Sequence, residues 1–136
     1  MAVPQTKLRE IVFLLLYSHG FTPNDEEGIV CKIMTELKVT KKVVYEALAQ
    51  MQKILEHLGD IDARIEGATD EYAFDRITRV ELNALRLGLF ELQYGQLLSK
   101  NIAISEAIRI TRKFGSPEGA NFVNALLEVL CKEEKV

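Results

Sequence analysis

The sequence is poor in proline, which breaks helices, and it lacks tryptophan. Its 136 residues include only three prolines. Scarce proline, together with abundant leucine, alanine, glutamate and lysine, favours helices over a sheet that would need many turns. A chain of this length is expected to form one domain that buries its core without disulfides or a metal.

Cysteines and long apolar runs are equally scarce. Cys31 and Cys131 lie far apart, without a C-x-x-C motif or a nearby histidine, so neither a zinc site nor a redox motif is predicted. We expect both thiols to be buried, as free cysteines usually are. No run of 18 apolar residues and no secretory signal pattern is present. These absences predict a cytoplasmic protein with no membrane partner.

Charge and histidine content limit the classes of function. The net charge of −3 argues against indiscriminate nucleic-acid binding, because phosphate affinity comes mostly from clustered lysines and arginines. Any RNA contact must therefore be a local patch. His19 and His57 have no serine, cysteine or carboxylate at a catalytic spacing. We expect a protein that is not an enzyme and has no cofactor or metal.

Apolar spacing predicts three helices in the first half. They cover residues 5–19, a stretch that opens at the capping signature of Asn24 and Glu27, and a stretch that begins at Thr40. Residues 59–71 are rich in small and acidic residues, and their helix content is left open. This segment is the predicted joint between an N-terminal half of about 1–60 and a C-terminal half of about 70–132.

The second half adds further helices, for a total of six or seven. Thr78 and Glu81 form a capping box before a helix that is apolar around much of its circumference, ends at Gly95 and is expected to be central. The next helix is predicted from Ile102 or Ile104 to Phe114, and Gly115 is expected to close it in the left-handed conformation. Ser116 then caps a last helix whose first residue is Pro117.

Charged residues on these helices allow more than one interpretation. On the apolar helix, Arg86 and Glu91 are expected to pair with each other or with a buried carbonyl. Arg109, Arg112 and Lys113 either compensate the negative end of their helix or form an edge that contacts phosphates. The sequence pattern leaves both roles open.

Three ordered blocks of the C-terminal half resemble the NusB family. In that family a helix reads leucine-arginine, small apolar residues, then an aromatic residue, glutamate and leucine, as residues 85–92 do here. The blocks are residues 74–92, residues 102–108, and residues 113–115 with 121–127. Together they span about 60 residues, so chance similarity is a poor explanation. The N-terminal match is weaker, and it rests on residues 9–10 and 16–18.

The resemblance implies an all-α fold of two small perpendicular helical bundles. It also implies a transcription antitermination factor that binds boxA RNA together with the ribosomal protein NusE. The complex then joins elongating RNA polymerase at ribosomal RNA operons. Carried over position by position, the implied RNA-binding residues are Lys7, Arg9, Lys113, Glu118 and Phe122. The implied protein-partner residues are Asp75, Arg76 and Glu81.

Several of these residues have a competing structural role. Phe122 fits a helix core as well as a stack on an RNA base, and Glu81 also completes the capping box. The family's arginine-rich start is reduced here to Lys7 and Arg9, with Gln5 and Thr6 beside them. Fewer phosphate contacts would lower both RNA affinity and its salt dependence.

Because the basic start of the chain is reduced to Lys7 and Arg9, two rival functions remain. One is a helical adaptor that keeps the protein surface and has weakened RNA binding. The other is a relative of the RNA-binding domain that precedes the catalytic domain in ribosomal RNA cytosine methyltransferases. That second rival is disfavoured, because no glycine-rich turn of a cofactor-binding domain follows. The sequence also leaves open whether the free protein is a homodimer.

Overall fold

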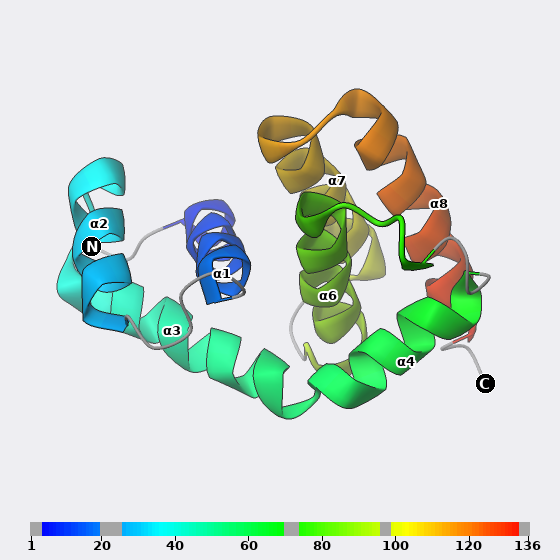
Figure 1. The fold of residues 1–136 in the computed structure, drawn as a ribbon, viewed down its shortest axis with the longest axis horizontal. Helices are drawn as coiled ribbons and strands as arrows, with labels where there is room; N and C mark the ends of the chain where they lie inside the picture. Colours follow the sequence, from blue (N-terminus) through cyan, green and yellow to red (C-terminus); the bar gives the residue numbers. More distant parts are fainter. Residues whose placement is uncertain (1–3, 20–25, 70–73, 96–98, 134–136) are drawn as a thin grey trace. The chain divides into compact units, whose positions relative to one another are not determined.

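The described residues of the chain fold mainly into α-helices (Figure 1). The computed structural model describes residues 4–19, 26–69, 74–95 and 99–133. Within those ranges there are seven α-helices and no strand, which confirms the predicted all-α class. The chain divides into two compact units, residues 1–55 and 56–136. Asn24, the predicted cap of the second helix, lies outside the described residues.

The first unit is built from α1 (Gln5–His19), α2 (Glu26–Leu37) and α3 (Lys41–Glu56), the last of which ends at the unit boundary. The start of α1 is set by Pro4, whose carbonyl oxygen accepts hydrogen bonds from the backbone N–H groups of Lys7 (3.0 Å) and Leu8 (3.1 Å). The helix buries more than one narrow stripe: Leu8, Arg9, Ile11, Val12, Phe13, Leu15 and Leu16. α1 therefore supplies much of this unit's buried apolar surface.

The link between α2 and α3 contains an unusual backbone conformation. Lys38 has a φ of 55°, in the left-handed region that glycine normally occupies at a helix end. The N–H of Val39 donates to the carbonyl oxygen of Met34 (3.3 Å), which is the bond expected after such a residue. Thr40 then caps α3, because its Oγ1 accepts from the N–H of Val43 (3.3 Å).

The second unit contains α4 (Leu58–Ala68), α6 (Arg79–Tyr94), α7 (Lys100–Phe114) and α8 (Pro117–Glu133) (Figure 1). α6 packs on all three others, which confirms its predicted central place. At Gly88, α6 approaches α7 and α8 closely, since a Cβ there would lie 3.0 Å from Leu127 Cδ1 and 3.2 Å from Ala107 Cβ. α4 fills most of the segment whose helix content the sequence left open.

Two predicted helix caps are confirmed. The N–H of Glu81 donates to Thr78 Oγ1 (3.2 Å), and the N–H of Thr78 donates to Glu81 Oε1 (3.4 Å). The N–H of Gly119 donates to Ser116 Oγ (2.9 Å) at the start of α8. These side chains replace the hydrogen bonds that the first turn of a helix lacks.

The prediction for α7 was right about its last residue, Phe114, and wrong in two other respects. The helix begins at Lys100, ahead of both predicted starts, because Ser99 Oγ accepts from the N–H of Ile102 (3.2 Å). Gly115 has a φ of −125°, so it is not a left-handed cap. Glycine is favoured there by space, since a Cβ would lie 2.9 Å from the carbonyl oxygen of Thr111 and 3.0 Å from Val80 Cγ1.

The expected partner of Arg86 was also wrong. Its guanidinium forms a two-point ion pair with Asp62 of α4, at 2.9 Å from Nε to Oδ1 and 2.8 Å from Nη2 to Oδ2. Nη1 also donates to Asn83 Oδ1 (3.2 Å). The pair joins α4 to α6, so a polar contact helps to fix α4 against the central helix.

Both thiols were predicted to be buried, and that prediction was wrong. Cys31 is exposed and Cys131 is partly exposed. Cys31 lies on α2 next to the buried Val30, and neighbouring positions on a helix face different directions. The general burial habit of cysteine was therefore overridden by the position of each residue on its helix.

Candidate nucleic-acid and partner interface

The first turns of α1 hold two of the predicted RNA-binding residues. Lys7 is partly exposed, whereas Arg9 is buried, with 7% of its surface accessible. A buried guanidinium must be paired or hydrogen-bonded, and Arg9 does have an interaction partner. Lys7 is therefore the more accessible of the two cations for a phosphate.

Three more predicted RNA-binding residues lie where α7 passes into α8. Lys113 is exposed, and its Nζ lies 5.5 Å from the ring centroid of Phe114. Glu118, in the first turn of α8, is exposed, and Phe122 is partly buried. Because Glu118 and Phe122 are four residues apart in a helix, they share one face of α8. The half-exposed ring of Phe122 leaves an aromatic surface beside a charged one.

The predicted partner residues lie in the short turn that precedes α6 and in the first turn of α6 itself. Asp75 and Arg76 are the exposed middle residues of a turn in which the N–H of Ile77 donates to the carbonyl oxygen of Phe74 (3.2 Å). Glu81 follows in the first turn of α6, where it is partly buried. Its capping bond to Thr78 uses Oε1. Capping and partner binding are compatible, because Glu81 keeps some accessible surface.

Glu81 also contacts α8. A Cβ on Gly119 would lie 2.6 Å from Glu81 Oε2 and 3.2 Å from its Cδ, so the carboxylate lies directly against the first turn of α8. The structure thus brings one predicted partner residue next to the segment that holds Glu118 and Phe122. Lys7 and Arg9 belong to the first unit, whereas the other predicted site residues belong to the second.

A cluster of three rings was missed by the sequence analysis. The His57 ring stacks on Tyr94 with centroids 4.0 Å apart, and the Phe90 centroid lies 5.3 Å from that of Tyr94. His57 precedes α4, and the other two residues end α6. Their distance in sequence gives no local signal. The contact gives His57 a packing role.

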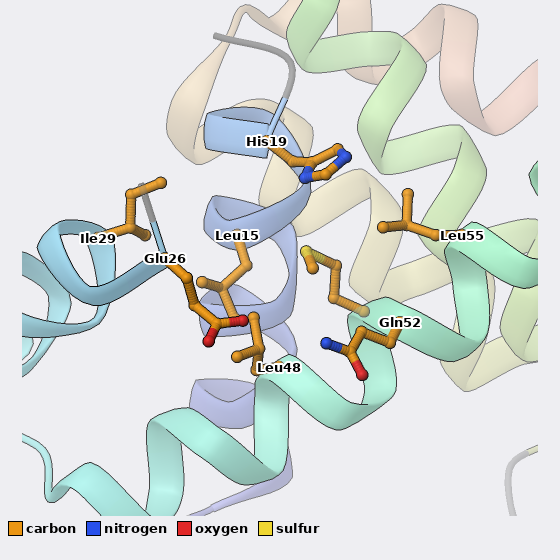
Figure 2. Close-up of a pocket in the computed structure, with 8 residues that line it drawn as sticks. Leu15, His19, Glu26, Ile29, Leu48, Gln52 and Leu55 are labelled. Atoms are coloured by element: carbon orange, nitrogen blue, oxygen red, sulfur yellow. The ribbon is translucent and has the colours of Figure 1, made fainter. Parts of the chain in front are cut away.

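The first unit contains a small pocket between its three helices (Figure 2). Figure 2 shows Leu15 and His19 of α1, Glu26 and Ile29 of α2, and residues of α3 around it. The lining is mainly apolar: Leu15, His19, Glu26, Ile29, Leu48, Met51, Gln52 and Leu55. Its volume of about 180 Å³ is below the roughly 300–1,000 Å³ of typical small-molecule sites. We assign no ligand to it.

In the part of the chain that the structure describes, no helix is long and apolar enough to cross a membrane. Among the same residues, no group of three or more histidine, cysteine, aspartate or glutamate side chains is placed to hold a metal ion.

Solved structures resemble this fold closely. T. maritima NusB has a TM-score of 0.83 and 30% sequence identity, with 98% of this chain and 94% of that chain covered. A second structure is described as the antitermination factors NusB and NusE in complex with double-stranded RNA. Its matching chain has a TM-score of 0.79, 24% identity and coverage of 95% of this chain and 96% of that chain. At that identity the likeness concerns the fold.

Sequence comparison identifies the family. Transcription antitermination protein NusB of Chlamydia pneumoniae is 40% identical over 124 residues, which cover 91% of this chain and 78% of that protein. The protein of the same name from Geobacter sp. (strain M21) is 32% identical over 131 residues, with 90% of both chains covered. The model of the NusB family matches residues 6–132. The chain therefore belongs to the NusB family.

Proposed function

We propose that this protein is a transcription antitermination factor that binds boxA-type RNA together with NusE. In this proposal it works in the cytoplasm, joins elongating RNA polymerase at ribosomal RNA operons, and has no catalytic role. The observation that carries the proposal is the family match over residues 6–132. The names of the relatives, and a solved complex of NusB with NusE and RNA, support it.

The residues proposed to bind RNA belong to both units, and they provide charge and one aromatic ring. Lys7 and Lys113 supply accessible positive charge for phosphates, and Arg9 supports the helix start that carries Lys7. Phe122 offers the exposed part of its ring to an unpaired base. Glu118, on the same face of α8, accepts hydrogen bonds from amino groups of the bases.

The proposed NusE surface is the start of α6. Asp75 and Arg76 are exposed and carry opposite charges, so they suit a polar rim that orients a protein partner. Glu81 anchors this surface to the capping box and to α8. Bound NusE would therefore lie near the helix that presents Phe122.

RNA binding is proposed to depend on both proteins. The start of α1 carries few basic residues. When this chain and NusE each bind one RNA weakly, the joint affinity rises through effective concentration. The test is to mix the chain with its cognate NusE and a boxA-type RNA. We expect RNA retention to exceed that of NusE alone. Equal retention would overturn the proposal, and scrambling the RNA sequence provides the control.

The burial of Arg9 supports a second candidate function. In this alternative the protein is an adaptor that binds NusE with weakened RNA binding. Substituting Lys7 and Arg9 together with alanine separates the two, because only the RNA-binding function should lose affinity. Lys7→Ala alone serves the same purpose if loss of the buried Arg9 unfolds the chain. Light scattering on the free protein shows whether it is a homodimer that covers this surface.

A further inference from the structure

A second basic surface lies on α7, outside the residues that the proposed function uses, apart from Lys113. It is a broad, open hollow of about 490 Å³, lined by Ser105, Ile108, Arg109, Arg112 and Lys113. These positions recur three and four residues apart, so they form one stripe along the helix. The stripe covers more of α7 than its last turn.

One cation of the hollow is held in place by a buried acid. Arg109 Nε lies 2.8 Å from Glu106 Oε2, and Nη2 lies 3.1 Å from Oε1. Glu106 is only 9% exposed, so it fixes the guanidinium against the helix. A guanidinium held this way loses little side-chain freedom when it meets an anion.

Arg112 provides the second cation. It is exposed, and in the part of the chain that the structure describes its guanidinium has no hydrogen bond or ion pair. Its donors are available to a ligand from outside. Lys113 adds positive charge at the same end of the hollow.

Compensation of the helix dipole does not explain the whole stripe. That effect falls off within the last turn, and Arg109 precedes it. The end of α7 is also closed by its own backbone, because the N–H of Gly115 donates to the carbonyl oxygen of Thr111 (2.7 Å). Arg109 is instead explained by its ion pair with Glu106, so the net positive charge of the hollow comes from Arg112 and Lys113.

We propose that this α7 hollow binds the phosphate backbone of single-stranded RNA. Guanidinium groups match phosphate oxygens in a two-point geometry. The hollow is open along the helix and does not enclose a ligand, which suits an extended strand better than a small molecule. Lys113 lies at its end and is also one of the residues proposed to bind RNA. The inference rests on the proposed function, and it places an RNA segment that flanks the recognised element.

The test compares two RNAs in the presence of NusE. One carries the boxA-type element alone, and the other carries the element with a short run of uridines added at each end. We expect the wild-type chain to bind an extended RNA more tightly. Arg112→Glu should lower the affinity for that RNA roughly three- to tenfold and reduce the salt slope by about 0.7. Binding of the short RNA should change less.

Two variants control for unrelated effects. Lys132→Glu makes the same charge change at an exposed position of α8, and it should leave the gain from the extension intact. Arg112→Gln removes the charge without introducing repulsion, and it should show a smaller loss of the same kind. Circular dichroism confirms that each variant is folded.

The outcomes separate the two proposals. If the wild-type chain binds the short RNA with NusE but Arg112→Glu leaves both RNAs and the salt slope unchanged, the hollow does not bind RNA. If Arg112→Glu instead weakens NusE binding without RNA, the hollow binds an acidic protein surface, and our inference is overturned. If the wild-type chain does not increase RNA retention at all, the proposed function itself fails.

Discussion

The carboxylate of Glu81 lies against the backbone of Gly119, at the point where the first turns of α6 and α8 meet. Position 119 has no room for a side chain, because a Cβ would lie 2.6 Å from Glu81 Oε2. A negative charge near the starts of two helices is favourable, since both helix dipoles present their positive ends there. Glu81 therefore stabilises two helices while it forms part of the proposed NusE surface.

Gly119→Ala should destabilise the second unit by about 1 kcal/mol. The new methyl group would push the Glu81 carboxylate away from Thr78, and loss of a helix cap typically costs about that much. Urea unfolding followed by circular dichroism measures the change.

Gly67→Ala is the matched control for this prediction. A Cβ at Gly67 meets no atom within 4 Å, and the residue lies inside α4. Alanine should therefore raise the free energy of unfolding by up to about 1 kcal/mol. If both alanine variants change stability in the same direction, the contact between Glu81 and position 119 is not the cause.

Asp62→Asn should lower the free energy of unfolding by about 1–3 kcal/mol. The substitution removes the charge that faces Arg86, and a partly buried guanidinium without its partner is costly. Asp60→Asn removes only an exposed charge from the first turn of α4 and should cost less, about 0.3–1 kcal/mol. Equal effects of the two variants in thermal unfolding would show that the ion pair contributes nothing specific.

Lys38→Gly should stabilise the first unit by roughly 0.5–1 kcal/mol. Glycine relieves the cost of the left-handed conformation at position 38, and its greater freedom in the unfolded chain offsets part of this gain. Lys38→Ala keeps the steric cost and should bring no comparable gain. A gain of the same size in both variants would indicate that the lysine charge, rather than the backbone conformation, is unfavourable.

Phe122→Ala should weaken RNA binding in the presence of NusE. Stacking of a base on an aromatic ring contributes about 1–3 kcal/mol, which corresponds to roughly a 5- to 150-fold change in affinity. Filter retention with a boxA-type RNA measures the change. Val129→Ala, which shortens another exposed side chain of α8, should leave RNA affinity unchanged. If Phe122→Ala binds RNA as the wild type does, its ring is part of the core only.

Helix positions and caps followed from the sequence because both depend on nearby residues. The capping box of Thr78 and Glu81 and the cap at Ser116 are recognisable from residue types at fixed short spacings. The start of α7 was missed because the prediction used the apolar pattern, which begins only after Ser99. The helix itself begins directly after Ser99, whose side chain caps it. Gly115 was misjudged because it is favoured by lack of space beside the Thr111 carbonyl and Val80, and Val80 belongs to another helix.

Contacts between helices, and the exposure of the candidate site residues, were less accessible to sequence reasoning. Asp62 and Arg86 are 24 residues apart and meet only when α4 packs on α6. The contact between Glu81 and Gly119 likewise depends on how two helices pack. The family resemblance supplied the site residues, but only the structure showed that Arg9 is buried and that Arg112 faces an open hollow.

The central place of α6 has a consequence for the timing of motions in the second unit. Because α6 is covered by α4, α7 and α8, its middle amide hydrogens should exchange with solvent only when the whole unit unfolds. The turn that carries Asp75 and Arg76 precedes this slowly opening helix. A protein that docks on the turn would thus bind beside a helix that is already ordered, so association would need to order little more of α6.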